Sequence, residues 1–243
     1  MIDIHSHIIF DVDDGSKTLE QSIKYLKEAK KVGVNKVVCT PHMSRDNKEK
    51  AIKIVEKFKK LRLEAAKLGI DLYLGNEIMY KDNTLKLLKE KKITTLNRTK
   101  YVLIEFKRGE NRNFEDIIFV LSEFVDCGYI PILAHPELYV NYRKITNYQK
   151  LKENGVLLQI DSTSLVRNKS SLKVRRFAKK LLKERLVDFV ASDTHCTKKR
   201  NYKSLKKAYK IVKKIDKNYA NIIFGENQLE IVGEVWKKKK LKI

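Results

Sequence analysis

The five histidines of this chain all lie at, or just beyond, the end of an apolar run that is typical of a β-strand. His5 and His7 end the first run, and their spacing of two places both side chains on the same side of a strand. His42 follows the second run, His135 the fifth and His195 the seventh. One histidine at a strand end is usually a hydrogen-bonded structural residue, but all five at equivalent positions indicate a shared site.

Acidic residues occupy the same place along other runs. Glu77 lies just past the third run, Glu105 near the end of the fourth and Asp193 after the seventh, while Asp13 and Asp14 follow the first. The carboxyl ends of parallel strands meet on one face of an α/β fold, so we expect these groups to share one pocket. Imidazole and carboxylate ligands without cysteine suit Mn, Zn, Fe or Co, with Mg also possible. Their number exceeds the needs of one ion, which predicts two or three.

Short runs rich in Val, Ile and Leu alternate with segments of helical period, such as 48–68. Thr18-Leu19-Glu20-Gln21 has the form of a capping box that opens a helix. This alternation predicts one α/β domain over residues 1–243, with about seven βα units and a parallel sheet closed as a barrel; an open doubly wound sheet is the alternative. The predicted strands are 2–9, 34–40, 70–75, 101–106, 129–134, 156–160 and 186–192.

The composition is strongly basic, with 53 Lys and Arg against 30 Asp and Glu and a formal net charge of +23. The lysines are spread over almost every predicted helix, which favours solvated helix faces over a nucleic-acid surface, and we expect no specific nucleic-acid partner. The four lysines at 237–240 could contact an anionic membrane surface weakly. Neither a signal region nor an apolar run long enough for a bilayer is recognisable, so we expect a cytoplasmic protein.

Several segments together resemble the PHP (polymerase and histidinol phosphatase) superfamily, and within it the metal-dependent bacterial protein-tyrosine phosphatases of the CpsB/CapC/YwqE group, which act in capsule and exopolysaccharide synthesis. They are His5-Ser6-His7, Phe10-Asp11-Val12-Asp13-Asp14-Gly15, Thr40-Pro41-His42, Glu77, Ile104-Glu105-Phe106, Ala134-His135-Pro136-Glu137 and Ser192-Asp193-Thr194-His195. The resemblance covers nearly the whole chain. It implies a distorted (β/α)7 barrel that holds three metal ions, with Mn2+ expected.

The resemblance also implies roles for individual residues. The metal ligands would be His5, His7, Asp14, His42, Glu77, Glu105, His135, Asp193 and His195. Glu77 is the expected bridging carboxylate, and Arg200 matches an arginine that holds phosphate at the pocket rim. The implied substrate is phosphotyrosine in the C-terminal tyrosine cluster of a bacterial tyrosine kinase. One departure is Leu138, where the family commonly has an arginine thought to contact the phosphate; Arg143 is a candidate replacement.

Other functions compete with this prediction. The segment from Cys39 to Arg45 satisfies the Cys-x5-Arg pattern of cysteine-dependent tyrosine phosphatases, but it contains no glycine and Pro41 removes one backbone donor. Histidinol-phosphate phosphatase is the nearest rival because it shares the superfamily and the chemistry. A PHP-type exonuclease or phosphodiesterase, and a binding module without catalysis, are further alternatives.

Overall fold

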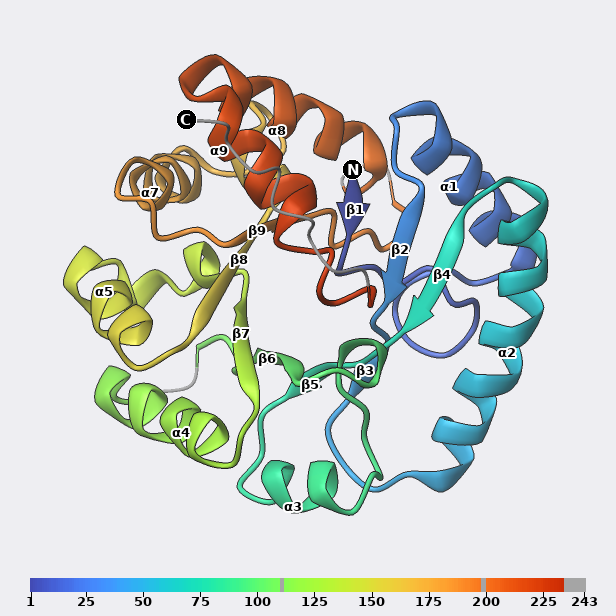
Figure 1. Cartoon of the computed structure of the whole chain (residues 1–243), viewed down its shortest axis with the longest axis horizontal. Coiled ribbons are helices and arrows are strands. Elements are labelled where there is room, and N and C mark those ends of the chain that lie inside the picture. The colour runs from blue at the N-terminus through green and yellow to red at the C-terminus, as the bar shows by residue number, and fades with distance from the viewer. Residues whose placement is uncertain (110–111, 198–199, 234–243) are drawn as a thin grey trace, which may run out of the picture.

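The computed structural model describes residues 1–109, 112–197 and 200–233; the four lysines at 237–240 lie outside this part of the chain. In Figure 1 the strands occupy the centre and the helices form a ring around them. The strands are β1 (Ile2–Asp3), β2 (Lys36–Cys39), β3 (His42–Met43), β4 (Asp71–Leu74), β5 (Glu77–Met79), β6 (Tyr101–Glu105), β7 (Ile130–Ala134), β8 (Leu157–Asp161) and β9 (Phe189–Ala191).

The helices follow the strands in alternation, as predicted. They are α1 (Leu19–Lys31), α2 (Lys48–Lys67), α3 (Thr84–Lys89), α4 (Phe114–Asp126), α5 (Ile145–Glu153), α6 (Ser162–Leu165), α7 (Leu172–Lys183), α8 (Tyr202–Ile215) and α9 (Lys217–Asn221). Single turns occur at Leu96–Arg98, Pro136–Leu138, Val140–Tyr142 and Ile222–Glu226. The predicted cap of α1 is present, since the Thr18 side chain accepts a hydrogen bond from the Gln21 backbone N–H.

All the strand pairs are parallel, which confirms the α/β class. The strands form two sheets, one in the order β1-β2-β4 and one in the order β3-β5-β6-β7-β8-β9. The sheets are joined where the first predicted strand continues past β1: Ser6 forms an isolated parallel bridge with Thr194, and its carbonyl accepts the Thr40 backbone N–H. The described strands therefore form a distorted ring of two sheets instead of one continuous closed ladder.

Two short strands that were not predicted follow the second and third predicted strands. β2 lies within the predicted strand 34–40, and β3 begins beyond it after Pro41, which has no backbone N–H to give to a ladder. β4 lies within the predicted strand 70–75, and β5 begins beyond Gly75, where a Cβ atom would lie 2.7 Å from Leu96. His42 and Glu77 are therefore the first residues of β3 and β5.

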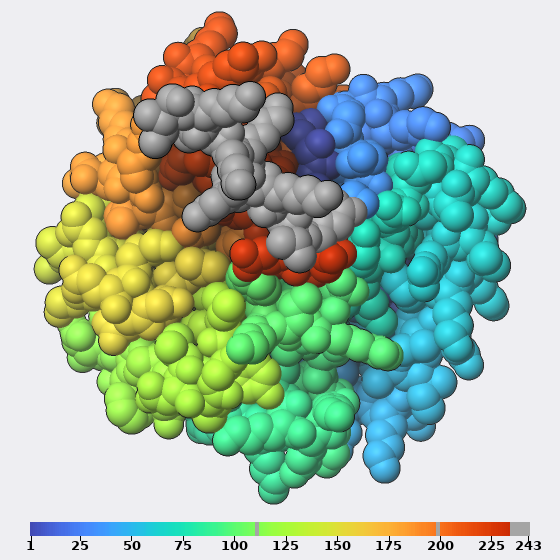
Figure 2. Space-filling view, in the orientation of Figure 1, coloured from blue at the N-terminus to red at the C-terminus, as the bar shows by residue number. Residues whose placement is uncertain are grey.

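Figure 2 shows successive segments of the chain following one another around the molecule, so that the last helices return to the first. Helix α8 packs against α1 and closes this ring. The interior of the ring is filled by side chains including Ile4, Val38 and Ile132, and Ile231 and Val232 from the last described turns pack against them. Among the described residues, none of the helices is long and apolar enough to span a membrane.

Candidate metal centre

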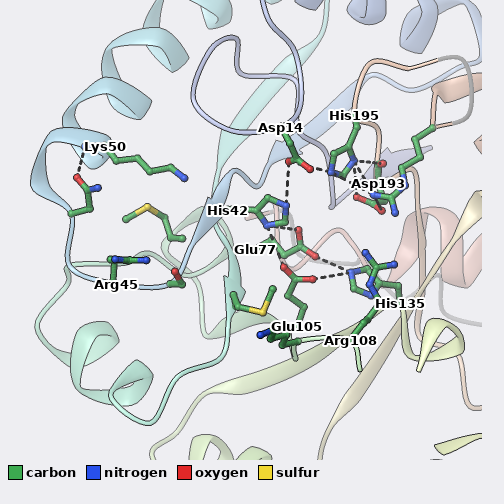
Figure 3. Close-up of a pocket in the computed structure, with 16 residues that line it drawn as sticks. Asp14, His42, Arg45, Lys50, Glu77, Glu105, Arg108, His135, Asp193 and His195 are labelled. Atoms are coloured by element: carbon green, nitrogen blue, oxygen red, sulfur yellow. Dashed lines mark hydrogen bonds and ion pairs between the residues drawn. The ribbon is translucent and has the colours of Figure 1, made fainter. Parts of the chain in front are cut away.

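The residues predicted to share a pocket do converge in the structure. His5 and His7 follow β1, His135 follows β7, and Asp193 and His195 follow β9. The remaining predicted ligands are Asp14 before α1, His42 and Glu77 at the start of β3 and β5, and Glu105 at the end of β6. Seven of the nine line one pocket, and Figure 3 shows them turned toward one another. The convergence expected from the strand ends is confirmed.

Glu77 lies at the middle of this cluster. Its Oε2 atom is 3.1 Å from Nε2 of His5, 3.1 Å from Nε2 of His7 and 3.1 Å from Nδ1 of His42. Its Oε1 atom is 3.0 Å from Nε2 of His135. One carboxylate therefore reaches four imidazoles with its two oxygens, and this central position is the one expected of the predicted bridging carboxylate.

The predicted ligands fall into three overlapping groups whose donor atoms lie within 4.8 Å of one another. His135 lies outside these groups but contacts Glu77 and, at 3.5 Å, Glu105. The groups are His5, His7, Glu77 and Asp193; His7, Asp14, His42 and His195; and His42, Glu77 and Glu105. Since they share His7, His42 and Glu77, these groups could hold neighbouring cations.

The positions of the donor atoms show whether metal ions would fit between them. Nε2 of His5 and Nε2 of His7 face each other at 3.2 Å, and at most one proton can lie between two neutral imidazoles. Within the described part of the chain, buried oxygens of Glu77, Glu105 and Asp193 form no well-aligned hydrogen bond, although imidazole or guanidinium nitrogens lie within 3.5 Å of them. Donors that bind one cation at about 2.1 Å lie roughly 3 Å apart, close to the separations seen here. The arrangement fits metal ions.

Electrostatics agree with this interpretation. Burial opposes protonation of His5 and His135, but the neighbouring carboxylates outweigh it and raise the pKa of His5 to about 9 and of His135 to about 10. Burial also opposes ionisation of Glu77 and Asp193, yet the surrounding histidines hold the pKa of both carboxyls well below the usual range. In the metal-free protein, protonated imidazoles therefore balance the negative charge of the carboxylates. The site as a whole favours bound positive charge.

Asp13 has a supporting role that was not predicted from the sequence. Its Oδ2 atom accepts hydrogen bonds from Nδ1 of His7 at 2.9 Å and from the His42 backbone N–H at 3.2 Å, while Oδ1 accepts from the Gly15 N–H at 2.9 Å. A carboxylate on one imidazole nitrogen leaves the other free to bind a metal. Asp13 therefore orients two of the predicted ligands. The pair Asp13-Asp14 was visible in the sequence, but nothing there distinguished the two residues.

Gln159 supports His5 in the same way. Its Oε1 atom lies 2.8 Å from Nδ1 of His5, and its Nε2 donates to Asp161 Oδ1 at 3.2 Å. Gln159 is fully buried on β8, a strand that contributes none of the predicted ligands. The signal in the sequence was an amide in the middle of the apolar run 156–160.

Arg200 lies at the wall of the pocket, as the resemblance implied. Its Nη1 atom is 2.9 Å from Asp193 Oδ2 and 3.2 Å from Nδ1 of His195. The suggested replacement for the missing arginine is not supported, because Arg143 does not line this pocket and its Nη2 atom instead donates to the Glu137 carbonyl at 3.3 Å. Leu138 borders a separate, smaller cavity.

The cysteine-based alternative is not supported by the structure. Cys39 is fully buried at the end of β2 and does not line the pocket. Burial raises the pKa of its thiol far above the usual range, so the thiol is not activated as a nucleophile. The main cavity, of about 660 Å³, is instead lined by seven of the nine predicted metal ligands and by Arg200, together with basic and methionine side chains.

Comparisons with known proteins agree with the geometry. A sequence model of the family described as "Capsular polysaccharide synthesis, CpsB/CapC" matches residues 1–233. The tyrosine-protein phosphatase CpsB of Streptococcus agalactiae serotype III is 38% identical over 244 residues, which cover 96% of this chain and 98% of that protein. The tyrosine-protein phosphatase YwqE of Bacillus subtilis is 31% identical over 217 residues, covering 88% and 84%.

A solved structure also resembles the whole chain. It comes from work on YwqE of Bacillus subtilis and CpsB of Streptococcus pneumoniae, described as unique metal-dependent tyrosine phosphatases. It superposes with a TM-score of 0.81 at 27% sequence identity and covers 97% of this chain and 96% of the other. The arrangement of strands and helices around the candidate metal centre is therefore shared with these enzymes.

Proposed function

The chain belongs to the CpsB/CapC family of capsular polysaccharide synthesis, and from this premise we propose that it is a metal-dependent protein-tyrosine phosphatase. The match over residues 1–233 supports the prediction that the chain forms one phosphatase domain. The observation that carries the proposal is the convergence of nine imidazole and carboxyl side chains around Glu77, beside a cavity large enough for a phosphorylated side chain.

We propose that two or three Mn2+ ions are held by the predicted ligands. They are His5, His7, Asp14, His42, Glu77, Glu105, His135, Asp193 and His195. The donor set would also accept Fe, Zn or Co, and Mg less readily. The choice of manganese is therefore based on the abundance of carboxylates and on the resemblance. Asp14 and His42 are the most exposed members and form the side of the centre open to substrate.

Cations bound there would neutralise the phosphoryl oxygens and would lower the pKa of an attacking water. The residues of the chain orient the reactants. Arg200 is the cation at the rim, and we propose that it pairs with the phosphate of the substrate. In the metal-free protein, burial and the charge of His7 lower the pKa of His195 to about 4, which leaves the His195 imidazole neutral and able to bind a cation. A phenolate leaving group, with a pKa of about 10, tolerates the lack of a strong acid.

The partner we propose is the tyrosine cluster at the C-terminus of a bacterial tyrosine kinase that controls capsule or exopolysaccharide synthesis. The family match supports a place in capsule synthesis. A cytoplasmic location, as expected from the sequence, is part of the proposal. Weak contact of the lysines at 237–240 with an anionic membrane stays a prediction, because these residues lie outside the described part of the chain.

The proposal is tested on chelated protein reconstituted separately with Mn2+, Zn2+, Fe2+, Co2+ and Mg2+. We expect hydrolysis of a phosphotyrosine peptide with at least one metal, loss of activity with EDTA, and much weaker activity on histidinol phosphate and single-stranded DNA. Glu77→Gln should lower bound metal and activity together, whereas the exposed control Glu184→Gln should change neither. Preference for histidinol phosphate or DNA, or full activity without metal, would refute the proposal.

A further inference from the structure

The main cavity extends well beyond the predicted metal ligands. Its outer part is lined by four basic residues, Arg45, Lys50, Lys107 and Arg108, which we call the cationic arm. In Figure 3, Arg45 and Lys50 lie on the side of the pocket opposite Asp193 and His195, whereas Arg108 lies below Glu105. These residues come from the β3–α2 connection, the first turn of α2 and the segment after β6.

The charge of the cationic arm is not balanced by neighbouring acids among the described residues. Asp46, next in sequence to Arg45, forms an ion pair with Lys92 at 2.8 Å. The carboxylates that line the cavity are Asp14, Glu77, Glu105 and Asp193, which are all members of the predicted ligand set. Once those carboxylates face cations, the outer part of the cavity is left with four positive charges.

The position of Lys50 does not help helix α2. Asn47 caps this helix by accepting the Lys50 backbone N–H, so Lys50 lies in the first turn. The positive end of the helix dipole disfavours a cation there. Residues that break a local rule of stability tend to occur at functional positions. Lys50 and the helix N-terminus thus add to the positive potential of the same cavity.

An apolar surface connects the cationic arm to the candidate metal centre. Met43 on β3 and Met79 on β5 line the same cavity as the ligands and the arm. Thioether side chains are adaptable and make favourable contacts with aromatic rings. The cavity therefore offers, in one continuous surface, a place for a phosphate, a place for an aromatic ring and a place for further anions.

Resting on the proposed phosphatase function, we infer that the cationic arm selects acidic substrates, by binding anionic groups that flank the phosphotyrosine. The chemistry that fits is an extended peptide whose neighbouring side chains are carboxylates or a second phosphotyrosine. Successive residues of an extended chain are about 3.3 Å apart, so a phosphotyrosine held at the metal centre brings its neighbours over the rim. A polynucleotide also carries repeated anions, but the mixed apolar and cationic lining favours a phosphotyrosine peptide.

The test compares kcat/KM for free phosphotyrosine, a phosphotyrosine peptide flanked by Gln, the same peptide flanked by Glu, and a doubly phosphorylated peptide. The variant is the double substitution Arg45→Gln and Lys50→Gln. The matched control removes the same charge from exposed positions of α8, by Lys206→Gln and Lys210→Gln. All proteins are used as full chains reconstituted with Mn2+.

We expect the preference for Glu over Gln flanks to fall roughly ten-fold in the double variant, since each exposed charge pair is worth about two- to five-fold. Activity on free phosphotyrosine should fall much less than activity on the Glu-flanked peptide, and the preference should stay unchanged in the α8 control. The preference should also shrink at high salt. A stronger preference for the doubly phosphorylated peptide would identify a second phosphotyrosine as the flanking anion, and a stronger preference for Glu would identify carboxylates; both support the inference.

An unchanged preference in the double variant, or an equal fall in the α8 control, overturns the inference while leaving the phosphatase function intact. Fluorescence anisotropy with the labelled Glu-flanked and Gln-flanked peptides reports binding to the arm separately from hydrolysis. If no phosphotyrosine compound is hydrolysed with any metal, the proposed function fails instead. A single-stranded oligonucleotide that displaces the labelled Glu-flanked peptide more strongly than the doubly phosphorylated peptide does also overturns the inference.

Discussion

Asp13→Asn is the substitution that tests most directly how the protein prepares its metal ligands. The Asp13 side chain is almost fully buried and receives hydrogen bonds from the His7 imidazole and from the backbone of Gly15 and His42. Asparagine has the same shape, but one of its two oxygens is replaced by a donor. Either orientation of the amide therefore places an NH2 group against an N–H donor.

The size of the effect follows from these contacts. Replacing the partner that orients a metal-binding histidine typically costs about 10- to 100-fold in metal affinity or activity. This corresponds to roughly 1.4–2.7 kcal/mol. Hydrogen bonds to a charged acceptor are worth about 1.5–3 kcal/mol each, which makes the upper part of that range the more reasonable expectation. Because Asp13 contacts both His7 and His42, we expect about 100-fold weaker metal binding.

Metal affinity is measured by calorimetric titration of the chelated protein with Mn2+, and bound metal by elemental analysis after dialysis. The matched control is Asp11→Asn, an exposed aspartate of the same loop whose carboxylate pairs with Lys53 and Lys57. This control should bind metal normally. If Asp13→Asn binds metal within two-fold of the unmodified protein, Asp13 does not orient the ligands and the reasoning is wrong.

The other predictions concern acidity, the buried thiol and the loop glycine. His5 and His135, with pKa values raised to about 9 and about 10, are protonated at pH 7 in the metal-free protein. Metal binding should therefore release protons, and metal affinity should fall as the pH falls. Calorimetric titrations in buffers of different ionisation enthalpy measure this proton release. Cys39→Ala should keep activity within about two-fold, since Cys39 packs in the core. Gly15→Ala should lower both the melting temperature and bound metal, because a Cβ would lie 2.0 Å from the His7 carbonyl oxygen, and overpacking costs about 1–3 kcal/mol or more.

Each of these predictions has a clear contrary result. Equal binding enthalpies in all buffers would mean that no protons are displaced from His5 and His135. Loss of activity in Cys39→Ala with normal metal content would restore the thiolate mechanism. An unchanged melting temperature in Gly15→Ala would show that the loop relaxes freely. The control is Gly225→Ala, because Gly225, like Gly15, has no positive φ, and a Cβ atom there meets nothing within 4 Å.

The position of the candidate metal centre was predictable because a parallel α/β fold imposes it. Strands alternating with helices bring their carboxyl ends to one face whatever the details of packing. His5, His135 and His195 therefore meet although up to 190 positions separate them in the sequence. Local signals were equally dependable, as the Thr18 cap of α1 and the bounds of α2 show, because they depend on residues within a few positions.

The structure alone decided where the short strands β3 and β5 form and what supports the ligands. The interruptions beside Pro41 and Gly75 depend on how neighbouring segments pack, so the predicted single ladder became two sheets. Gln159 contacts His5 across 154 positions, and the cationic arm joins residues from the start of α2 and the connection before it with residues from the segment after β6. Such contacts join residues that are far apart in the sequence, and neither their residue types nor their spacing marks them in the sequence. The sequence by itself therefore determined which ligands gather, whereas the tertiary structure decided which residues hold them and what shape of substrate the cavity accepts.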